Sequence, residues 1–323
     1  MISGHAARQR GLVTAAQARA AGLSSEDVRL LLTSGEWARV RRGVYAVGLE
    51  GMSEFAAAQR RRDDALCLNL EIDHVRSHTS AALVLGLAVL NSPRTHLTTR
   101  HLSASRREAD LTVHVGRYLA SDVVEVAGVR CSTAARTALD IAREYGVRHG
   151  VVALDSALRI GTRATEIERS LGSMRRWPGV RTARRAWALA DSGAESVGET
   201  LARLLVLELG HGTPETQFGL TDGHRTAYAD LRLGRHLIEF DGETKYRAEN
   251  GTSAEQTVWR EKQREDWLRG FRLGMSRLTW TECFRPTPEV RTRLTREYES
   301  TCRAFGTGID DLAPYRIDRR LAG

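Results

Sequence analysis

The chain has 323 residues, of which 41% are hydrophobic and 27% charged, with six prolines. These proportions exclude a collagenous or a disordered chain, and the length predicts about two domains. The longest apolar run, Ala81–Leu90, is about half as long as a bilayer span, and the N-terminal residues lack an apolar signal region. We therefore expect a cytoplasmic protein that does not enter a membrane.

The 48 basic residues outnumber the 40 acidic ones, and the net charge of +8 favours an acidic partner such as nucleic acid. The four cysteines are scattered without metal-ligand spacing, so we expect neither a zinc site nor a disulfide framework. Only two basic residues are lysines, Lys245 and Lys262, and both lie in the C-terminal part. A site that needs a compact ammonium group cannot use arginine, so their placement suggests a role; chance is the alternative.

The first 35 residues have the pattern of two short helices. Thr14 and Gln17 have capping-box spacing, which predicts the start of a helix that ends near residue 21. Ser24 and Ser25 cap a second helix. Its apolar residues recur at helical spacing, and they are Val28, Leu31 and Leu32.

Two short strands are expected next, at 36–40 and 43–47. Two helices followed by a β-ribbon are typical of a winged helix-turn-helix, whose second helix enters the major groove of DNA. The residues that we expect to contact DNA are Arg29, Arg39, Arg41 and Arg42. The alternative is an interaction module with a solvated basic hairpin, which the acidic start of the second helix, Glu26-Asp27, favours.

The middle section reads as a mixed α/β domain without an assigned chemistry. Its expected strands cover 95–99, 111–115 and 123–131, the last with a turn at Ala127-Gly128. Its expected helices cover 134–145, 149–159, 164–174 and 182–191.

The C-terminal part is predicted to contain a helix at 196–209, a hairpin at 228–233 and 236–241, a helix from 253 to 269 and a strand at 271–280. If Gly234-Arg235 is a two-residue turn, paired positions sum to 469, and Asp230 lies opposite Glu239. Opposed residues of an antiparallel pair share a face, so these two carboxylates and Asp241 are expected to converge.

Converging carboxylates repel one another, and a divalent cation removes the conflict. Oxygen ligands select Mg²⁺ or Mn²⁺, so Asp230 and Glu239 are the expected metal ligands of a phosphoryl-transfer site. Lys245 is the expected water-positioning or charge-stabilising group, and Glu199 a further catalytic acid. Three alternatives stay open: Glu199 caps a helix, Asp241 belongs to a turn, or the hairpin carries its acids on a solvated face.

The C-terminal run Ile238-Glu-Phe-Asp-Gly-Glu-Thr-Lys-Tyr, with the later segments 261–268 and 270–280, resembles the very-short-patch-repair-like nucleases of the PD-(D/E)xK superfamily. The resemblance implies Mg²⁺-dependent hydrolysis of DNA phosphodiesters in a three-layer restriction-endonuclease-like α/β domain. It makes Asp230, Glu239 and Glu199 the motif acids. Asp241 stands where the motif has lysine, so Lys245, or Lys262 as second choice, is expected to supply the ammonium.

The N-terminal runs Gly11-Leu-Val-Thr and Arg42-Gly-Val-Tyr resemble the winged helix of AbiEi-type antitoxins of type IV toxin–antitoxin systems, and 77–82 and 132–140 resemble the region after that domain in many such proteins. The expected protein is multi-domain α+β: a winged helix-turn-helix at 1–52, a middle domain at 53–192, a nuclease-like domain at 193–300 and a tail at 301–323. We expect a DNA-binding endonuclease; the alternative is an antitoxin-type transcriptional regulator with an inactive nuclease-like domain and a cognate toxin.

Overall fold

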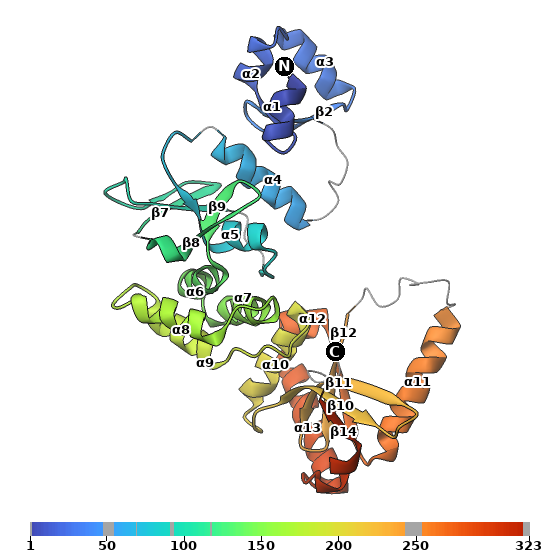
Figure 1. The fold of residues 1–323 in the computed structure, drawn as a ribbon. Coiled ribbons are helices and arrows are strands. Elements are labelled where there is room, and N and C mark those ends of the chain that lie inside the picture. The colour runs from blue at the N-terminus through green and yellow to red at the C-terminus, as the bar shows by residue number, and fades with distance from the viewer. Residues whose placement is uncertain are drawn as a thin grey trace. The chain divides into compact units, whose positions relative to one another are not determined.

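The computed structural model describes residues 2–47, 55–68, 70–90, 94–116, 118–242 and 254–318. The chain forms two compact units. Figure 1 shows the course of the chain and labels its helices and strands. The first comprises Met1–Glu144 with Thr165–Trp177, and the second comprises Tyr145–Ala164 with Pro178–Gly323. The sequence predicted four segments along the chain. Their boundaries stay a prediction, because the division into two units does not resolve them.

The first unit begins with a winged-helix fold. Its elements are α1 (Ile2–Arg8), β1 (Leu12–Thr14), α2 (Ala15–Ala20), α3 (Ser25–Thr33), β2 (Trp37–Arg41) and β3 (Val44–Val47), and the strand order is β1-β3-β2. Both predicted helices and the hairpin are confirmed, and Thr14 with Gln17 closes the expected capping box. The sequence did not indicate α1 or β1, since a three-residue strand is too short to show alternation.

The small sheet of the winged helix is covered on both faces. One face packs Val13, Ala18 and Trp37 into a cluster that α3 completes. The other face packs Leu12 and Val44 against Ala65 of α4 (Phe55–Cys67). Because the next residue of α4, Leu66, enters the core of a second sheet, α4 joins the winged helix to the rest of this unit.

The second sheet of this unit has six strands in the order β6-β7-β5-β4-β9-β8. They are β4 (Val75–Arg76), β5 (Thr95–Thr99), β6 (Arg106–Arg107), β7 (Leu111–Val115), β8 (Val123–Val126) and β9 (Val129–Ser132). The accompanying helices are α5 (His78–Leu85), α6 (Ala134–Tyr145), α8 (Ala164–Ser173) and the short η1 (Ala120–Asp122). The strands and helices predicted here are confirmed, the long expected strand being the hairpin β8–β9.

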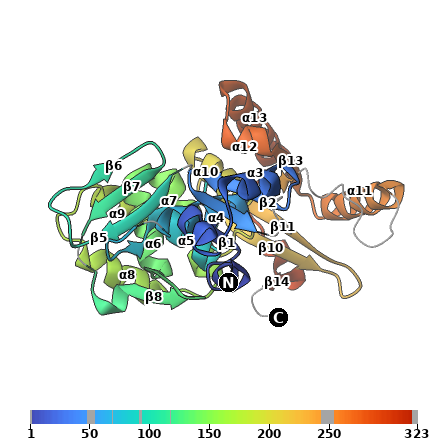
Figure 2. The same ribbon diagram turned by 90° about the horizontal axis from the view of Figure 1, so that it is seen from above.

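The second unit is built on a five-stranded sheet of order β13-β12-β11-β10-β14. Figure 2 labels β10, β11, β13 and β14 of this sheet. Its strands are β10 (Glu215–Thr221), β11 (Thr226–Leu233), β12 (His236–Asp241), β13 (Gly274–Thr279) and β14 (Arg316–Asp318). Its helices are α7 (Val147–Arg159), α9 (Val180–Ala188), α10 (Val197–Leu209), α11 (Ala254–Gly270), α12 (Trp280–Phe284), α13 (Pro288–Phe305) and the short η3 (Asp310–Tyr315).

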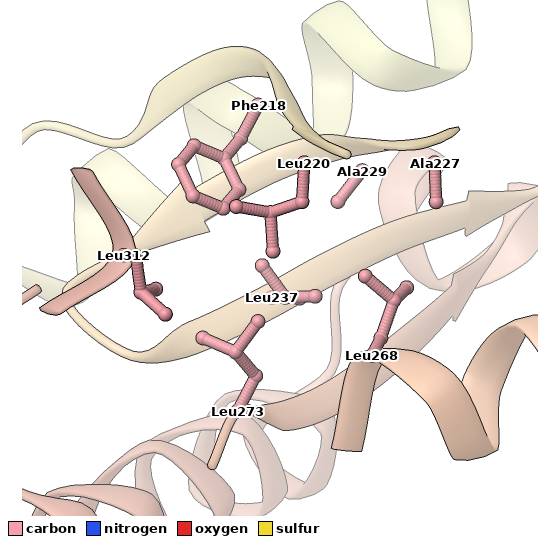
Figure 3. Close-up of a cluster of buried hydrophobic side chains, with 8 residues drawn as sticks. All are labelled: Phe218, Leu220, Ala227, Ala229, Leu237, Leu268, Leu273 and Leu312. Atoms are coloured by element: carbon pink, nitrogen blue, oxygen red, sulfur yellow. The ribbon is translucent and has the colours of Figure 1, made fainter. Parts of the chain in front are cut away.

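This sheet lies between two helical layers, as alternate residues of β12 show. Leu237 packs with Leu268 of α11 on one face (Figure 3). His236 bonds Thr301 of α13, and Phe240 contacts α10 on the other face, where a Cβ on Gly198 would lie 2.1 Å from the Phe240 ring. The observed arrangement is therefore a three-layer α/β unit in which helix and sheet approach closely.

Residues 301–318 belong to this fold. The segment from 301, expected as a tail, contributes the last turn of α13, η3 and β14, which pairs with β10. The strand expected at 271–280 is shorter, because Thr279 caps α12 and Trp280 is its first residue.

His236 is a buried histidine that joins the sheet to α13. Its Nδ1 and Nε2 lie 2.7 Å from the hydroxyls of Thr301 and Ser276, and Ser276 in turn donates to Glu297. Burial lowers the pKa of His236 to about 4, although Glu297 opposes this shift. The folded protein thus holds the neutral imidazole, whereas the unfolded chain binds a proton near pH 6.5.

Acidification is therefore expected to cost stability through His236. Between pH 7 and pH 5 the unfolded state gains a proton that the folded state does not, which lowers the free energy of unfolding by about 2 kcal/mol. Urea denaturation of the wild type and of His236→Gln at pH 7 and pH 5 measures this pH effect. The difference between their free energies of unfolding should be smaller at pH 5 by about 2 kcal/mol. The exposed His224→Gln is the control, and a difference that does not change with pH contradicts the prediction.

Candidate nucleic-acid interface

Helix α3 presents one polar face to solvent. Val28, Leu31 and Leu32 pack toward the core of the winged helix. The opposite face carries Arg29 and Leu30, and both are exposed. Since the apolar residues recur at helical spacing, the remaining positions form a continuous outer face, which is the face that a recognition helix turns to DNA.

The acidic residues at the start of α3 are engaged within the helix. Asp27 accepts from the backbone N–H and the hydroxyl of Ser24, and these bonds lower the pKa of Asp27. Glu26 accepts two hydrogen bonds from Arg29, at 3.0 and 2.5 Å. The acidic start, which the sequence offered as evidence against DNA binding, is therefore paired or used as a cap.

A groove of about 330 Å³ lies beside α3. Three arginines from three elements line it: Arg19 of α2, Arg29 of α3 and Arg39 of β2. The other lining residues are Ala15, Ser24, Ser25, Val28, Leu32 and Tyr45. Guanidinium groups are suited to phosphate oxygens, so the groove offers an anion site next to the outer face of α3 once Arg29 exchanges Glu26 for a phosphate.

Sequence reasoning found Arg29 and Arg39 but not Arg19. The exposed position of Arg19 in the last turn of α2 was the available signal, since Ala18 beside it is buried. Arg39 lies on the same face of the sheet as its partner Tyr45, which directs it toward α2 and α3.

The wing is the turn between β2 and β3. Gly43 there has a φ of +76°, a conformation that a glycine adopts without strain. Arg42 is exposed at this turn, and Arg41 Nη2 lies 3.9 Å from Asp110 Oδ2. The two wing arginines thus stand apart from the groove lining, at the tip where a wing meets a DNA backbone.

The second candidate region is the hairpin β11–β12. Its register follows the predicted arithmetic, with Leu231 opposite Ile238 and Leu233 opposite His236. The last backbone pair of the two strands is Leu231 with Ile238, one position before Asp230 and Glu239. There the carboxylate of Asp230 accepts the backbone N–H of Phe240 at 2.8 Å.

The remaining acids are satisfied by protein groups. Glu239, 8% exposed, accepts from Arg264 of α11 at 2.6 Å. Glu199 accepts from the backbone N–H of Glu195, from the Ser196 hydroxyl and from Gln217, and Ser196 is the N-cap residue of α10. The repulsion that suggested a cation is therefore relieved by neighbouring donors.

The expected convergence of three carboxylates is not found in the described part of the chain. Among the described residues, one group of three possible metal ligands has donor atoms that all lie within 4.8 Å of one another. It consists of His78, His96 and His114. Asp241 is half-buried at the end of β12, opposite Thr279. Lys262 is exposed on α11, and Lys245 lies outside the described residues.

Comparison with known proteins assigns a family description to the N-terminal part. Residues 5–48 match a family described as "Transcriptional regulator, AbiEi antitoxin". Two relatives, "Uncharacterized protein Rv2248" and "Uncharacterized protein MT2308" of Mycobacterium tuberculosis strains H37Rv and CDC 1551, are each 29% identical over 162 residues. The match covers 48% of this chain and 58% of each relative. Within the described ranges, no helix combines the length and apolar character that a bilayer crossing requires.

Proposed function

We propose that this chain is a DNA-binding transcriptional regulator of the AbiEi antitoxin type. The observation that carries the proposal is the groove lined by Arg19, Arg29 and Arg39 beside the outer face of α3. It lies within the residues that match the regulator family. Phosphates bound in the groove hold the winged helix in register, and the exposed side chains of α3 read base edges in the major groove.

The same proposal includes a cognate toxin, since the matched family is described as an antitoxin. It also agrees with the hydrogen bonds that Asp230, Glu239 and Glu199 accept within the protein. A regulator needs no cleavage, so Asp230, Glu239 and Glu199 serve the fold in this account.

Selection from a pool of random DNA duplexes tests the proposal. The full chain should enrich one sequence motif at physiological salt, because a specific site binds about 10³-fold or more tightly than random DNA. Leu30→Glu on the outer face of α3 should abolish the enrichment, since a carboxylate there repels the DNA. The matched control is Leu119→Glu, at another exposed leucine of the first unit. Equal recovery of all sequences by the wild type would contradict a regulator.

A second candidate function is a Mg²⁺-dependent endonuclease. Three features favour it. The elements follow one another in the order α10, β10, β11, β12, α11, β13, and β12 pairs in parallel with β13. Asp230 and Glu239 lie in the adjacent strands β11 and β12. Carboxylate oxygens suit Mg²⁺, so these residues fit the ion once Arg264 leaves Glu239. Asp230 and Glu239 would hold the Mg²⁺, which would supply Lewis-acid polarisation of a scissile phosphate and activation of a water. Glu199 would orient Gln217, and Lys245, or Lys262 in its place, would stabilise charge.

Plasmid nicking distinguishes the two functions. An endonuclease converts supercoiled plasmid DNA to the nicked circular form in the presence of Mg²⁺ or Mn²⁺. Asp230→Asn should lower the rate of this conversion at least about 100-fold, because one metal ligand is lost. Asp266→Asn on the exposed side of α11 is the matched control. Absence of cleavage by the wild type, or equal cleavage by Asp230→Asn, would exclude this candidate and leave the regulator.

A further inference from the structure

Three histidines from separate elements meet in the first unit. His78 is the first residue of α5, His96 lies in β5 and His114 lies in β7. One ring nitrogen of each lies within 4.8 Å of the others, and His96 Nδ1 is 2.9 Å from His114 Nε2. The ring centroids of His78 and His114 are 4.0 Å apart in a stacked arrangement. Three imidazole nitrogens therefore lie close enough together for one ion, which the stacked rings bind once they turn their nitrogens toward it.

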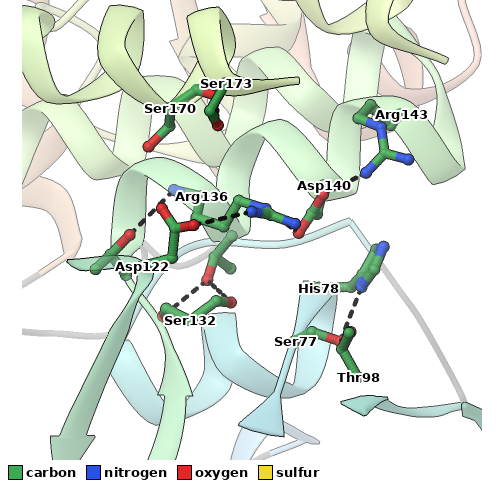
Figure 4. Close-up of polar contacts among 12 residues, drawn as sticks. Ser77, His78, Thr98, Asp122, Ser132, Arg136, Asp140, Arg143, Ser170 and Ser173 are labelled. Atoms are coloured by element: carbon green, nitrogen blue, oxygen red, sulfur yellow. Dashed lines mark hydrogen bonds and ion pairs between the residues drawn. The ribbon is translucent and has the colours of Figure 1, made fainter. Parts of the chain in front are cut away.

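The position of His78 is held by its surroundings. Its backbone has a φ of +49°, a conformation that costs a side-chain-bearing residue about 1 kcal/mol or more and that recurs at functional sites. Its Nδ1 lies 3.0 Å from the Ser77 hydroxyl, which also accepts from Thr98 (Figure 4). When Nδ1–H donates to Ser77, Nε2 keeps its lone pair, as in metal-ligating histidines that donate their other nitrogen to a neighbour.

The cluster is neutral and largely shielded from water. His78 and His96 are buried and His114 is half-buried. Burial lowers the pKa of all three, that of His96 to about 3. Neutral imidazole is the form that binds metal ions, and no proton has to be removed from these rings near pH 7.

Four arginines and two carboxylates act on the cluster, and several of them are paired with one another. Arg143 repels a cation at the cluster, yet it is paired with Asp140 at 2.5 Å. Glu144 faces His114 and attracts a cation there, although it also pairs with Arg107. Thr112, the register partner of His96, keeps its hydroxyl buried with no hydrogen-bond partner among the described residues.

From this geometry we infer that His78, His96 and His114 bind a divalent first-row transition-metal ion, with Zn²⁺ as the reference ion. Imidazole nitrogens suit Zn²⁺, and three protein ligands leave a fourth position for water on the half-buried side of His114. Binding replaces the His96–His114 hydrogen bond and joins α5, β5 and β7 through one ion. The ligands stand 18 residues apart along the chain, so no local cysteine or histidine spacing reveals them.

Calorimetric titration of the chelator-treated full chain with Zn²⁺ tests the inference. The wild type should bind one equivalent tightly, and His96→Gln should bind at least about 100-fold more weakly. Ser77→Ala keeps all three ligands but loses the hydrogen bond to His78, so its affinity should fall about 10- to 100-fold. The exposed His101→Gln is the matched control and should bind as the wild type does.

Co²⁺ supplies a readout that does not depend on the ligand variants folding. Its visible spectrum in the wild type should be that of a four-coordinate ion with nitrogen and oxygen ligands, without thiolate charge transfer. Ser77→Ala should show the same bands at higher Co²⁺ concentrations. No bound equivalent in the wild type, thiolate bands, or unchanged affinity in both His96→Gln and Ser77→Ala would overturn the inference and leave a hydrogen-bonded histidine stack.

Discussion

Replacing Arg19, Arg29 and Arg39 together by alanine should weaken DNA binding by the full chain about 100- to 1000-fold at 0.1 M salt. The three side chains line one groove beside α3. Each phosphate contact adds about 0.9 to the slope of log K against log salt, so three contacts contribute about 2.7 logarithmic units at 0.1 M. Fluorescence anisotropy with a labelled duplex between 50 and 300 mM salt measures both the affinity and the slope.

The salt slope separates phosphate contacts from a general change of charge. The control replaces three exposed arginines of the second unit, Arg269, Arg296 and Arg303, and removes the same formal charge. It should change the slope little, whereas the groove variant should lower it by about 3. If both triple variants lose affinity equally, the groove is not the DNA site.

Replacing Arg136 by methionine should lower the free energy of unfolding of the first unit by about 3 to 5 kcal/mol. Arg136 is 2% exposed and binds Asp140 at 2.8 Å and Asp122 at 3.3 Å (Figure 4). Its guanidinium also lies 4.8 and 4.5 Å from the ring centroids of Tyr118 and Trp177. Methionine fills the space but leaves buried carboxylates with fewer partners.

Urea denaturation at pH 7 measures this loss. The matched control is Arg107→Met, which removes an exposed arginine paired with Glu144 and should cost less than about 1 kcal/mol. Arg136→Met/Asp122→Asn, which removes one of the stranded charges, should recover part of the stability lost in Arg136→Met. Similar losses in Arg136→Met and Arg107→Met would show that the buried network does not stabilise the unit.

The local pattern of the chain predicted most of the elements that the structure contains. The turn at Gly234-Arg235 set the register of β11 and β12, because a two-residue turn fixes which residues oppose each other. The capping box at Thr14 likewise set the start of α2. Elements shorter than one period of their pattern, such as β1 and β4, were not predicted, and neither were the longer α4, α13 and β10.

Partners from distant parts of the chain decide what the candidate sites do, and local spacing does not show them. Arg264 lies 25 residues from Glu239 and neutralises it. Arg19, Arg29 and Arg39 meet only after α2, α3 and β2 pack together. The same holds for the histidine cluster, whose members come from three elements. Sequence reasoning therefore identified the winged helix correctly but overestimated the charge conflict on β11–β12.

Site-directed cleavage of DNA from α3 tests the central claim most directly. An iron chelate attached to Leu30→Cys, with Cys67 and Cys302 replaced by alanine, places the cutting centre on the exposed face of α3; Cys131 and Cys283 are buried. The account predicts strand cuts clustered within a few base pairs of the selected site, and at least about tenfold fewer cuts from Arg303→Cys on α13. Equal or reversed cutting by the two proteins would contradict DNA binding through α3.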